Sequence, residues 1–173
     1  MSSANIFVVS DTHFGHANMY KFIESDGLPV RKKADGSHMS MEEGDDLMVE
    51  NWNKTVGDND IVYHLGDVYF GTGHERLYAL KGRKRLLLGN HDDGKDKRLH
   101  GLFEKILVWR MFPEFNCVLS HMPLHDSNLF KVKYNLHGHI HRKPNPSPIH
   151  INCSVEMQDY TPKSIEDILK TIR

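Results

Sequence analysis

The chain has 173 residues, of which 39% are apolar and 26% charged, and its formal net charge is −1. These values predict a single globular domain over residues 1–173, with a core large enough to need no disulfide framework. They exclude a global basic field that would recruit nucleic acid or an anionic membrane, and no apolar run reaches the ~20 residues of a membrane-spanning helix.

The first half of the chain alternates apolar runs of strand length with helical patterns. Its predicted elements are a strand at Ile6–Ser10, a helix at Phe14–Ser25, a surface loop at 26–44, a helix at Met41–Val56, a strand at Asp60–Leu65, a short helix at Glu75–Leu80 and a strand at Arg85–Leu88. The second long helix has the clearest start, because Ser40 can cap it and Glu43 follows three residues on.

The second half is richer in strand patterns. Its predicted elements are strands at Ile106–Trp109, Asn116–Ser120, Tyr134–His137 and Ile149–Cys153, and a closing amphipathic helix at Ser164–Ile172. Strands that alternate with helices predict an α/β domain with a largely parallel or mixed sheet, and the β-rich half predicts a second sheet packed against it.

The two cysteines and the first residues bear on the compartment. Cys117 and Cys153 each lie in a strand-like run, which favours free, buried thiols in a reducing cytosol over a disulfide. Met1–Asn5 leads directly into an apolar strand without the basic region of a secretory signal. We therefore expect a cytoplasmic protein.

Five short pieces, each following an apolar run, carry side chains that bind metals. They are Asp11-Thr12-His13, Gly66-Asp67, Gly89-Asn90-His91-Asp92, His121 and Gly138-His139-Ile140-His141. The chain has 13 histidines, more than packing requires. Together the pieces supply carboxylates, imidazoles and one amide, which suit two adjacent divalent ions. Such a pair can grip a phosphate, make hydroxide from water and support a leaving oxygen.

Taken alone, each of the first two pieces is a weak signal for metal ligands. Asp11 and His13 are two residues apart, so in extended chain they share a face, although the same residues could simply cap a following helix. Gly66 permits a tight exit from its strand, and the Asp67 carboxylate can bridge two ions. A plain Gly-Asp turn is the alternative for this piece.

The third piece also offers groups for catalysis. Asn90 is a serviceable oxygen ligand. Asp92 can accept a hydrogen bond from His91 and fix its tautomer, and a positioned His91 can stabilise a phosphate oxygen or protonate a leaving group. His16 lies one helical turn past His13, so it could touch substrate or lie on a helix surface.

Several other residues are interpreted as structural. His64 and His137 are expected to be core histidines, and Trp52 and Trp109 are expected to pack in the core. Four histidines are expected on the surface: His38, His74, His100 and His150. The basic run 81–85 is expected to be a solvated corner.

The complete set resembles the calcineurin-like metallophosphoesterase superfamily, in particular its small single-domain bacterial and phage members. Those members also share Ser-Asp-Thr-His-Phe-Gly-His, Asn-Trp-Asn and a Val-Glu…Tyr-x-Pro segment, which here are residues 10–16, 51–53 and 155–162. The resemblance implies an α/β fold of two packed mixed β-sheets flanked by helices, a four-layer sandwich.

The resemblance also implies a role for each site residue. Asp11, His13 and His141 would hold a first ion. Asp67 would bridge to a second ion, held also by Asn90, His121 and His139. His91 would contact the phosphate, with Asp92 as its orienting partner, while a metal-bound hydroxide attacks phosphorus in line.

The same blocks bear on the substrate. Residues 66–71 lack the Asp and Arg of the corresponding phosphoprotein phosphatase block, and the third block ends in Asp92 where those enzymes have Glu. A small nucleotide-like or other phosphodiester is therefore the expected substrate, with Mn²⁺ the expected metal and Fe, Zn²⁺, Ni²⁺ or Mg²⁺ left open. The alternatives are a phosphomonoesterase or nucleotidase, a nuclease for which nucleic acid would be the substrate, a non-catalytic metal-binding interaction module, and a mononuclear iron oxygenase. The sequence leaves the oligomeric state open.

Overall fold

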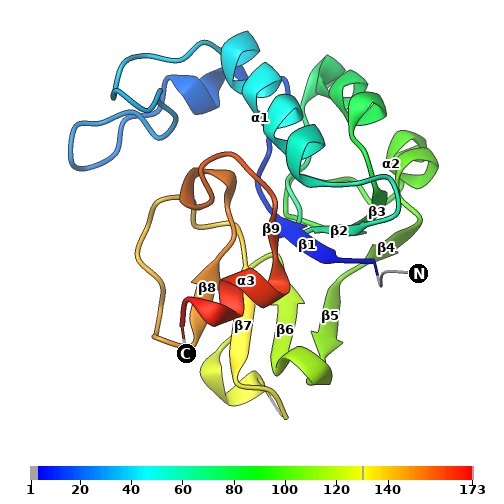
Figure 1. Ribbon diagram of the computed structural model, residues 1–173. Helices are drawn as coiled ribbons and strands as arrows, with labels where there is room; N and C mark the ends of the chain where they lie inside the picture. The colour runs from blue at the N-terminus through cyan, green and yellow to red at the C-terminus, as the bar shows by residue number, and fades with distance from the viewer. Residues whose placement is uncertain (1–3, 130, 173) are drawn as a thin grey trace.

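The computed structural model describes residues 4–129 and 131–172, whose strands form two β-sheets (Figure 1). The first sheet has the strand order β4-β3-β2-β1-β9, with β1 (Ile6–Val9), β2 (Ile61–His64), β3 (Arg83–Leu87), β4 (Lys105–Leu107) and β9 (Lys163–Ser164). The second has the order β5-β6-β7-β8, with β5 (Trp109–Phe112), β6 (Cys117–Ser120), β7 (Tyr134–His137) and β8 (His150–Asn152). One edge strand of each sheet, β9 or β5, is antiparallel and the other strands are parallel. Both sheets are therefore mixed, as the sequence predicted.

The alternation of side chains along the strands divides the core into layers. Tyr63 of β2 packs between the two sheets, whereas its neighbour Val62 packs under the helices α1 (Met41–Thr55) and α2 (Lys97–Leu102). On β6, Leu119 faces the first sheet and Val118 faces outward. On the outer face of the second sheet, Leu124, Leu129 and Val132 pack in one cluster with Val118. The short helix α3 (Ile165–Lys170) packs with the residues between the sheets. Figure 1 shows α1 and α2 on one side of the first sheet.

Helix α1 has the start that its sequence predicted. The Ser40 side chain accepts a hydrogen bond from the Glu43 N–H, and the Glu43 carboxylate accepts one from the Ser40 N–H, which satisfies both orphan donors reciprocally. Trp52 on its inner face is 1% exposed, so the core position predicted for it is confirmed. Cys117 and Cys153 are free and buried, as expected.

The helix predicted over Phe14–Ser25 is wrong. Residues 11–14 instead run beside the segment after β2, because Asp11 N–H donates to the Gly66 carbonyl and Phe14 N–H to the Val68 carbonyl. Gly15 then takes a φ of +78°, a left-handed conformation that ends any regular helix here. Only a 3₁₀ turn at Ala17–Tyr20 follows.

The predictions around Trp109 and His150 also need correction. The single strand expected at Ile106–Trp109 is two strands, β4 and β5, which belong to different sheets. Because Trp109 begins the edge strand β5, its side chain is 56% exposed and does not pack in the core. His150 is 3% exposed and contacts Asp126, so it is not a surface residue. Two elements of the structure, α2 and β9, were not predicted from the sequence. Among the described residues, no helix is both long and apolar enough to cross a membrane.

Candidate metal centre

The candidate ligands lie just beyond the carboxyl ends of parallel strands from both sheets. Asp11 follows β1, Asp67 follows β2 and Asn90 follows β3, all in the first sheet. His121 follows β6 and His139 follows β7 in the second. The carboxyl ends of parallel strands lie on the same side of a sheet. Each ligand group described below combines residues that follow strands of the first sheet with residues that follow strands of the second.

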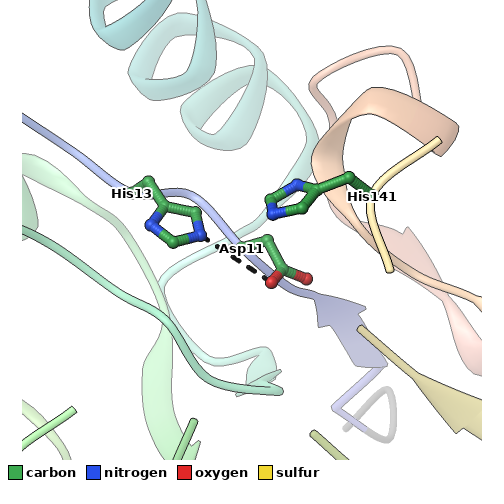
Figure 2. Close-up of side chains that lie close together, drawn as sticks. All are labelled: Asp11, His13 and His141. Atoms are coloured by element: carbon green, nitrogen blue, oxygen red, sulfur yellow. Dashed lines mark ion pairs between the residues drawn. The ribbon is translucent and has the colours of Figure 1, made fainter. Parts of the chain in front are cut away.

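Asp11, His13 and His141 form the first group of possible ligands. One nitrogen or oxygen of each lies within 4.8 Å of those of the other two. The Asp11 Oδ1 and His13 Nε2 atoms are 3.9 Å apart. Figure 2 shows the carboxylate and the two imidazoles converging on one another.

Asp67, His121 and His139 form a second group, whose ligand atoms also lie within 4.8 Å of one another. Asn90 joins it, since its Oδ1 lies 2.9 Å from His121 Nε2. The other ring nitrogen of His121, Nδ1, lies 2.8 Å from the Leu65 carbonyl, which can only accept. A neutral His121 that keeps its proton on Nδ1 for this carbonyl would present its Nε2 lone pair to an ion.

Asp67 stands between the two groups. Its Oδ2 is 3.6 Å from His13 Nε2 of the first group and 3.4 Å from His121 Nε2 of the second. Its Oδ1 accepts a hydrogen bond from His91 N–H at 2.9 Å, which holds the carboxylate in place. This is the position from which one carboxylate can serve two ions.

The unsatisfied polar atoms of the first group fit a cation. Asp11 Oδ1 and both ring nitrogens of His13 are buried and have no hydrogen-bond partner. A buried polar atom without a partner is costly, so a native site that keeps three of them requires an explanation. Ligands that bind one ion at about 2.1 Å stand a few ångströms from one another, as these atoms do. The residues therefore fit divalent metal ions.

The backbone of the ligands is strained. Among the described residues, eight non-glycine residues have a positive φ, and five of them are candidate ligands: Asp11, His13, Asp67, His139 and His141. Each such conformation costs about 1–3 kcal/mol and persists where surrounding contacts impose it. His139 is one example, because its N–H donates to Asp11 Oδ2 at 2.9 Å. Asp11 and His13 thus converge through left-handed backbone and not through the strand alternation expected from their spacing.

His91, Asp92 and His16 lie around this cluster. The ring centroid of His91 is 5.8 Å from that of His13, and His91 is exposed, as a group that meets substrate would be. Asp92 accepts hydrogen bonds from the backbone N–H groups of Asp67, Val68 and Gly89 at 2.8 to 3.0 Å. It thus fixes the Asp67 loop to the Gly89 loop, in place of the expected bond to His91. The half-buried His16 ring lies 5.6 Å from His13.

Two buried charged residues near the cluster were not singled out from the sequence. Arg31 lies in the polar loop before α1, and Glu156 lies in the Val-Glu segment of the resemblance, for which no role was assigned. Their side chains are 0% and 1% exposed. Burial by itself would raise the pKa of Glu156, but the charge of Arg31 and the hydrogen bond from His141 outweigh it and lower the pKa to about 2. An arginine in a polar loop gives no sequence signal of burial.

The buried His64 braces the loops and makes stability depend on pH. Its Nδ1 accepts from Gly66 N–H at 3.1 Å, and its Nε2 lies 2.9 Å from the Thr12 hydroxyl, which donates to the Val68 carbonyl. Burial lowers the pKa of His64 to about 3, from 6.5. Between these values the unfolded chain holds the extra proton. The stability from neutral His64 is therefore complete above pH 6.5 and is lost as the pH falls, by about 1.4 kcal/mol per pH unit.

Urea unfolding of the metal-free protein between pH 5 and pH 7 measures this dependence. We expect the free energy of unfolding to decrease as the pH is lowered. In His64→Gln this decrease per pH unit should be smaller, by about the contribution of one histidine. Burial also lowers the pKa of His137, to about 4, so part of the slope should remain in this variant. Equal slopes in the wild type and His64→Gln would contradict the assignment.

Gly138 is a close-approach position beside Asp11. A Cβ on it would overlap Ser10 Oγ and Asp11 Oδ2. We expect Gly138→Ala to displace the Asp11 carboxylate, weaken metal binding by about 10–100-fold and destabilise the fold by about 1–3 kcal/mol. Metal titration and chemical denaturation measure both effects. Gly101→Ala in α2 is the matched control: its Cβ would meet nothing within 4 Å, so stability should hold or rise.

The chain is similar to one protein family, to several relatives and to a solved structure. A family model described as Calcineurin-like phosphoesterase matches residues 4–170. The uncharacterized protein MJ1445 of Methanocaldococcus jannaschii is 32% identical, over 99% of this chain and 93% of the relative. The Gene 66 protein of Mycobacterium phage D29 is 27% identical, over 86% and 87%. The crystal structure of the protein of unknown function AQ665 from Aquifex aeolicus superposes with a TM-score of 0.71 at 26% identity, over 98% of this chain and 100% of that one.

Proposed function

The chain belongs to the calcineurin-like phosphoesterase family, whose members are metal-dependent phosphoester hydrolases, and from this we propose a dinuclear phosphodiesterase that acts on small nucleotide-like or other phosphodiesters. The observation that supports it most directly is the carboxylate of Asp67, which faces a ligand nitrogen of each of the two groups. Asp11, His13 and His141 would hold one ion, and Asn90, His121 and His139 the other, with Asp67 shared.

Two divalent ions, when bound, supply an activated water and neutralise charge on the phosphoryl oxygens. The chain's own residues position the ligands and supply a hydrogen-bond or proton donor. The backbone N–H of His91 and the bonds of Asp92 hold the Asp67 carboxylate in a fixed place between the ligand groups. The exposed His91 side chain can then donate a proton to the leaving oxygen or a hydrogen bond to a phosphoryl oxygen.

An aromatic wall beside the site supports a substrate with a flat leaving group. The rings of His16 and Phe70 stack, with centroids 4.1 Å apart and planes inclined by 22°. Phe70 is in turn 5.3 Å from the ring of His91. Phe22 meets His16 edge-on at 6.4 Å, and its side chain is 49% exposed. Such rings offer a stacking face to a nucleobase or aryl group next to the phosphate.

The other features of this proposal follow from the ligand chemistry. Oxygen and imidazole donors suit Mn²⁺, and Fe, Zn²⁺, Ni²⁺ and Mg²⁺ are the other candidates. The substrate is a small phosphoester in the cytoplasm, and nucleic acid would enter only as a substrate. The net charge of −1 gives no extended attraction for a polyanion, which disfavours a nuclease.

The test is hydrolysis of bis(p-nitrophenyl) phosphate and p-nitrophenyl phosphate by chelated protein, resupplied with Mn²⁺, Ni²⁺, Zn²⁺ or Mg²⁺ in turn. Metal-restored turnover that favours the diester is the expected result. Preference for the monoester would replace the proposal with a phosphomonoesterase or nucleotidase. Two bound ions without turnover of any ester would favour a metal-binding interaction module.

A further inference from the structure

We infer that Arg31 and Glu156 act together as a positioning unit for the first ligand group, Asp11, His13 and His141. The inference rests on the metal site of the proposed function, and it assigns a role to the polar loop before α1. That loop is the part of the chain drawn in blue to cyan ahead of α1 in Figure 1.

Glu156 fixes the ring of His141. Its Oε2 lies 3.3 Å from His141 Nδ1, so the Nδ1–H donates to the carboxylate. The Nε2 lone pair of the neutral ring is then left for a metal. The Glu156 carboxylate is itself held, because its Oε1 accepts from Arg31 Nε at 2.8 Å.

Arg31 fixes the backbone of the other two ligands. Its Nη2 donates to the Asp11 carbonyl at 2.6 Å, and its Nη1 donates to the Thr12 carbonyl at 2.9 Å. These carbonyls lie between Asp11 and His13, which both have left-handed φ values, 58° and 46°. One guanidinium therefore binds to both the strained ligand loop and the carboxylate behind His141.

The unit contacts the first group and not the second. In the second group the ring of His121 is oriented by the Leu65 carbonyl, a neutral backbone acceptor. No described hydrogen bond of Arg31 or Glu156 reaches Asp67, Asn90, His121 or His139. Loss of an ion pair that only stabilises the fold would weaken metal binding by both groups alike. Loss of a positioning unit would weaken metal binding by one group.

The loop is well placed to present Arg31. Val30 packs with Met19, Tyr20 and Met39 in a small core cluster of its own. The Lys32 N–H donates to the Tyr160 hydroxyl at 3.2 Å, and Arg142 donates to the Pro29 carbonyl at 3.1 Å. The residues on both sides of Arg31 are therefore anchored to the segments that carry His141 and Glu156.

Glu156→Gln is the main test, with titration of metal-free protein by Mn²⁺ as the readout. We expect two binding steps in the wild type, and in the variant one step weakened by about 10–100-fold with the other unchanged. Glu43→Gln is the matched control, since Glu43 also pairs with a cation of the same loop, Lys33, at 2.7 Å, but in solvent. It should leave both steps unchanged.

A second background tests whether Glu156 acts through His141. In a His141→Ala protein, adding Glu156→Gln should cause no further loss of Mn²⁺ affinity, because the ring that Glu156 orients is gone. Arg31→Lys should weaken the same binding step as Glu156→Gln, since one ammonium cannot reach the carboxylate and both carbonyls. If Glu156→Gln does not fold, Arg31→Lys decides the question by the same titration.

Two results would overturn the inference. One is wild-type Mn²⁺ binding in Glu156→Gln and Arg31→Lys. The other is equal weakening of both steps together with a lower Tm of the metal-free variant, the pattern of a structural ion pair. These results are separate from the proposed function: a wild type that binds two ions in the expected pattern but hydrolyses no ester would refute the function and leave the positioning role standing.

Discussion

Replacing Asp67 with asparagine is expected to lower phosphoester hydrolysis by more than about 100-fold and to weaken both metal-binding steps together. The loss exceeds that for residues behind the ligands, which is typically about 10–100-fold. The reason is position: Asp67 Oδ2 faces His13 and His121 at 3.6 and 3.4 Å, so the charge removed is shared by both groups. Metal stoichiometry and hydrolysis of bis(p-nitrophenyl) phosphate measure the two effects.

The matched control for Asp67 is Asp58→Asn, an exposed aspartate in the turn before β2. It should keep wild-type metal content and activity. Weakening of only one binding step in Asp67→Asn would show that this carboxylate serves a single ion, and the role of Asp67 as a ligand shared by two ions would then be wrong.

Replacing His91 with alanine is expected to lower kcat by about 10²–10⁴-fold, the usual contribution of a proton-transferring side chain. Metal content should stay nearly intact, because the contact between this residue and Asp67 is made by the His91 backbone N–H, which alanine keeps. The expected signature is therefore a slow enzyme with full metal. Single-turnover rates and metal analysis of the same sample check it.

His100→Ala is the control for His91, since His100 is an exposed histidine whose Nε2 lies 2.9 Å from the Gly94 carbonyl. It should leave the rate unchanged. Loss of metal from His91→Ala would instead place His91 among the ligands, and the assignment of a role toward the phosphate would be wrong.

Much of the site was predictable because its pieces follow apolar strands. Residues 62–65 and 86–88 are recognisable as buried strands, and parallel strands bring the residues after them to one edge. The structure accordingly gathers Asp67, Asn90 and His121, which are far apart in sequence. Helix α1 was predictable for another reason, because its capping box is a local sequence signal.

The features that escaped prediction depend on contacts distant in sequence. The helix expected after Asp11 is absent because this segment bonds to the chain after β2, as no local pattern indicates. Trp109 was assigned to the core because large aromatic residues usually are, but it begins an edge strand. Arg31 was unremarkable in a polar loop, since its burial is set by the carbonyls of Asp11 and Thr12.

The origin of the ligands in two different sheets has a mechanical consequence. An ion held by Asp11 and His141, or by Asp67 and His139, fastens one sheet to the other in the manner of a covalent cross-link between distant parts of the chain. A ligand that binds only the folded state raises its stability by mass action. Chelation should therefore lower the Tm as well as abolish turnover, because the bound ions would hold the two sheets in a fixed relative position.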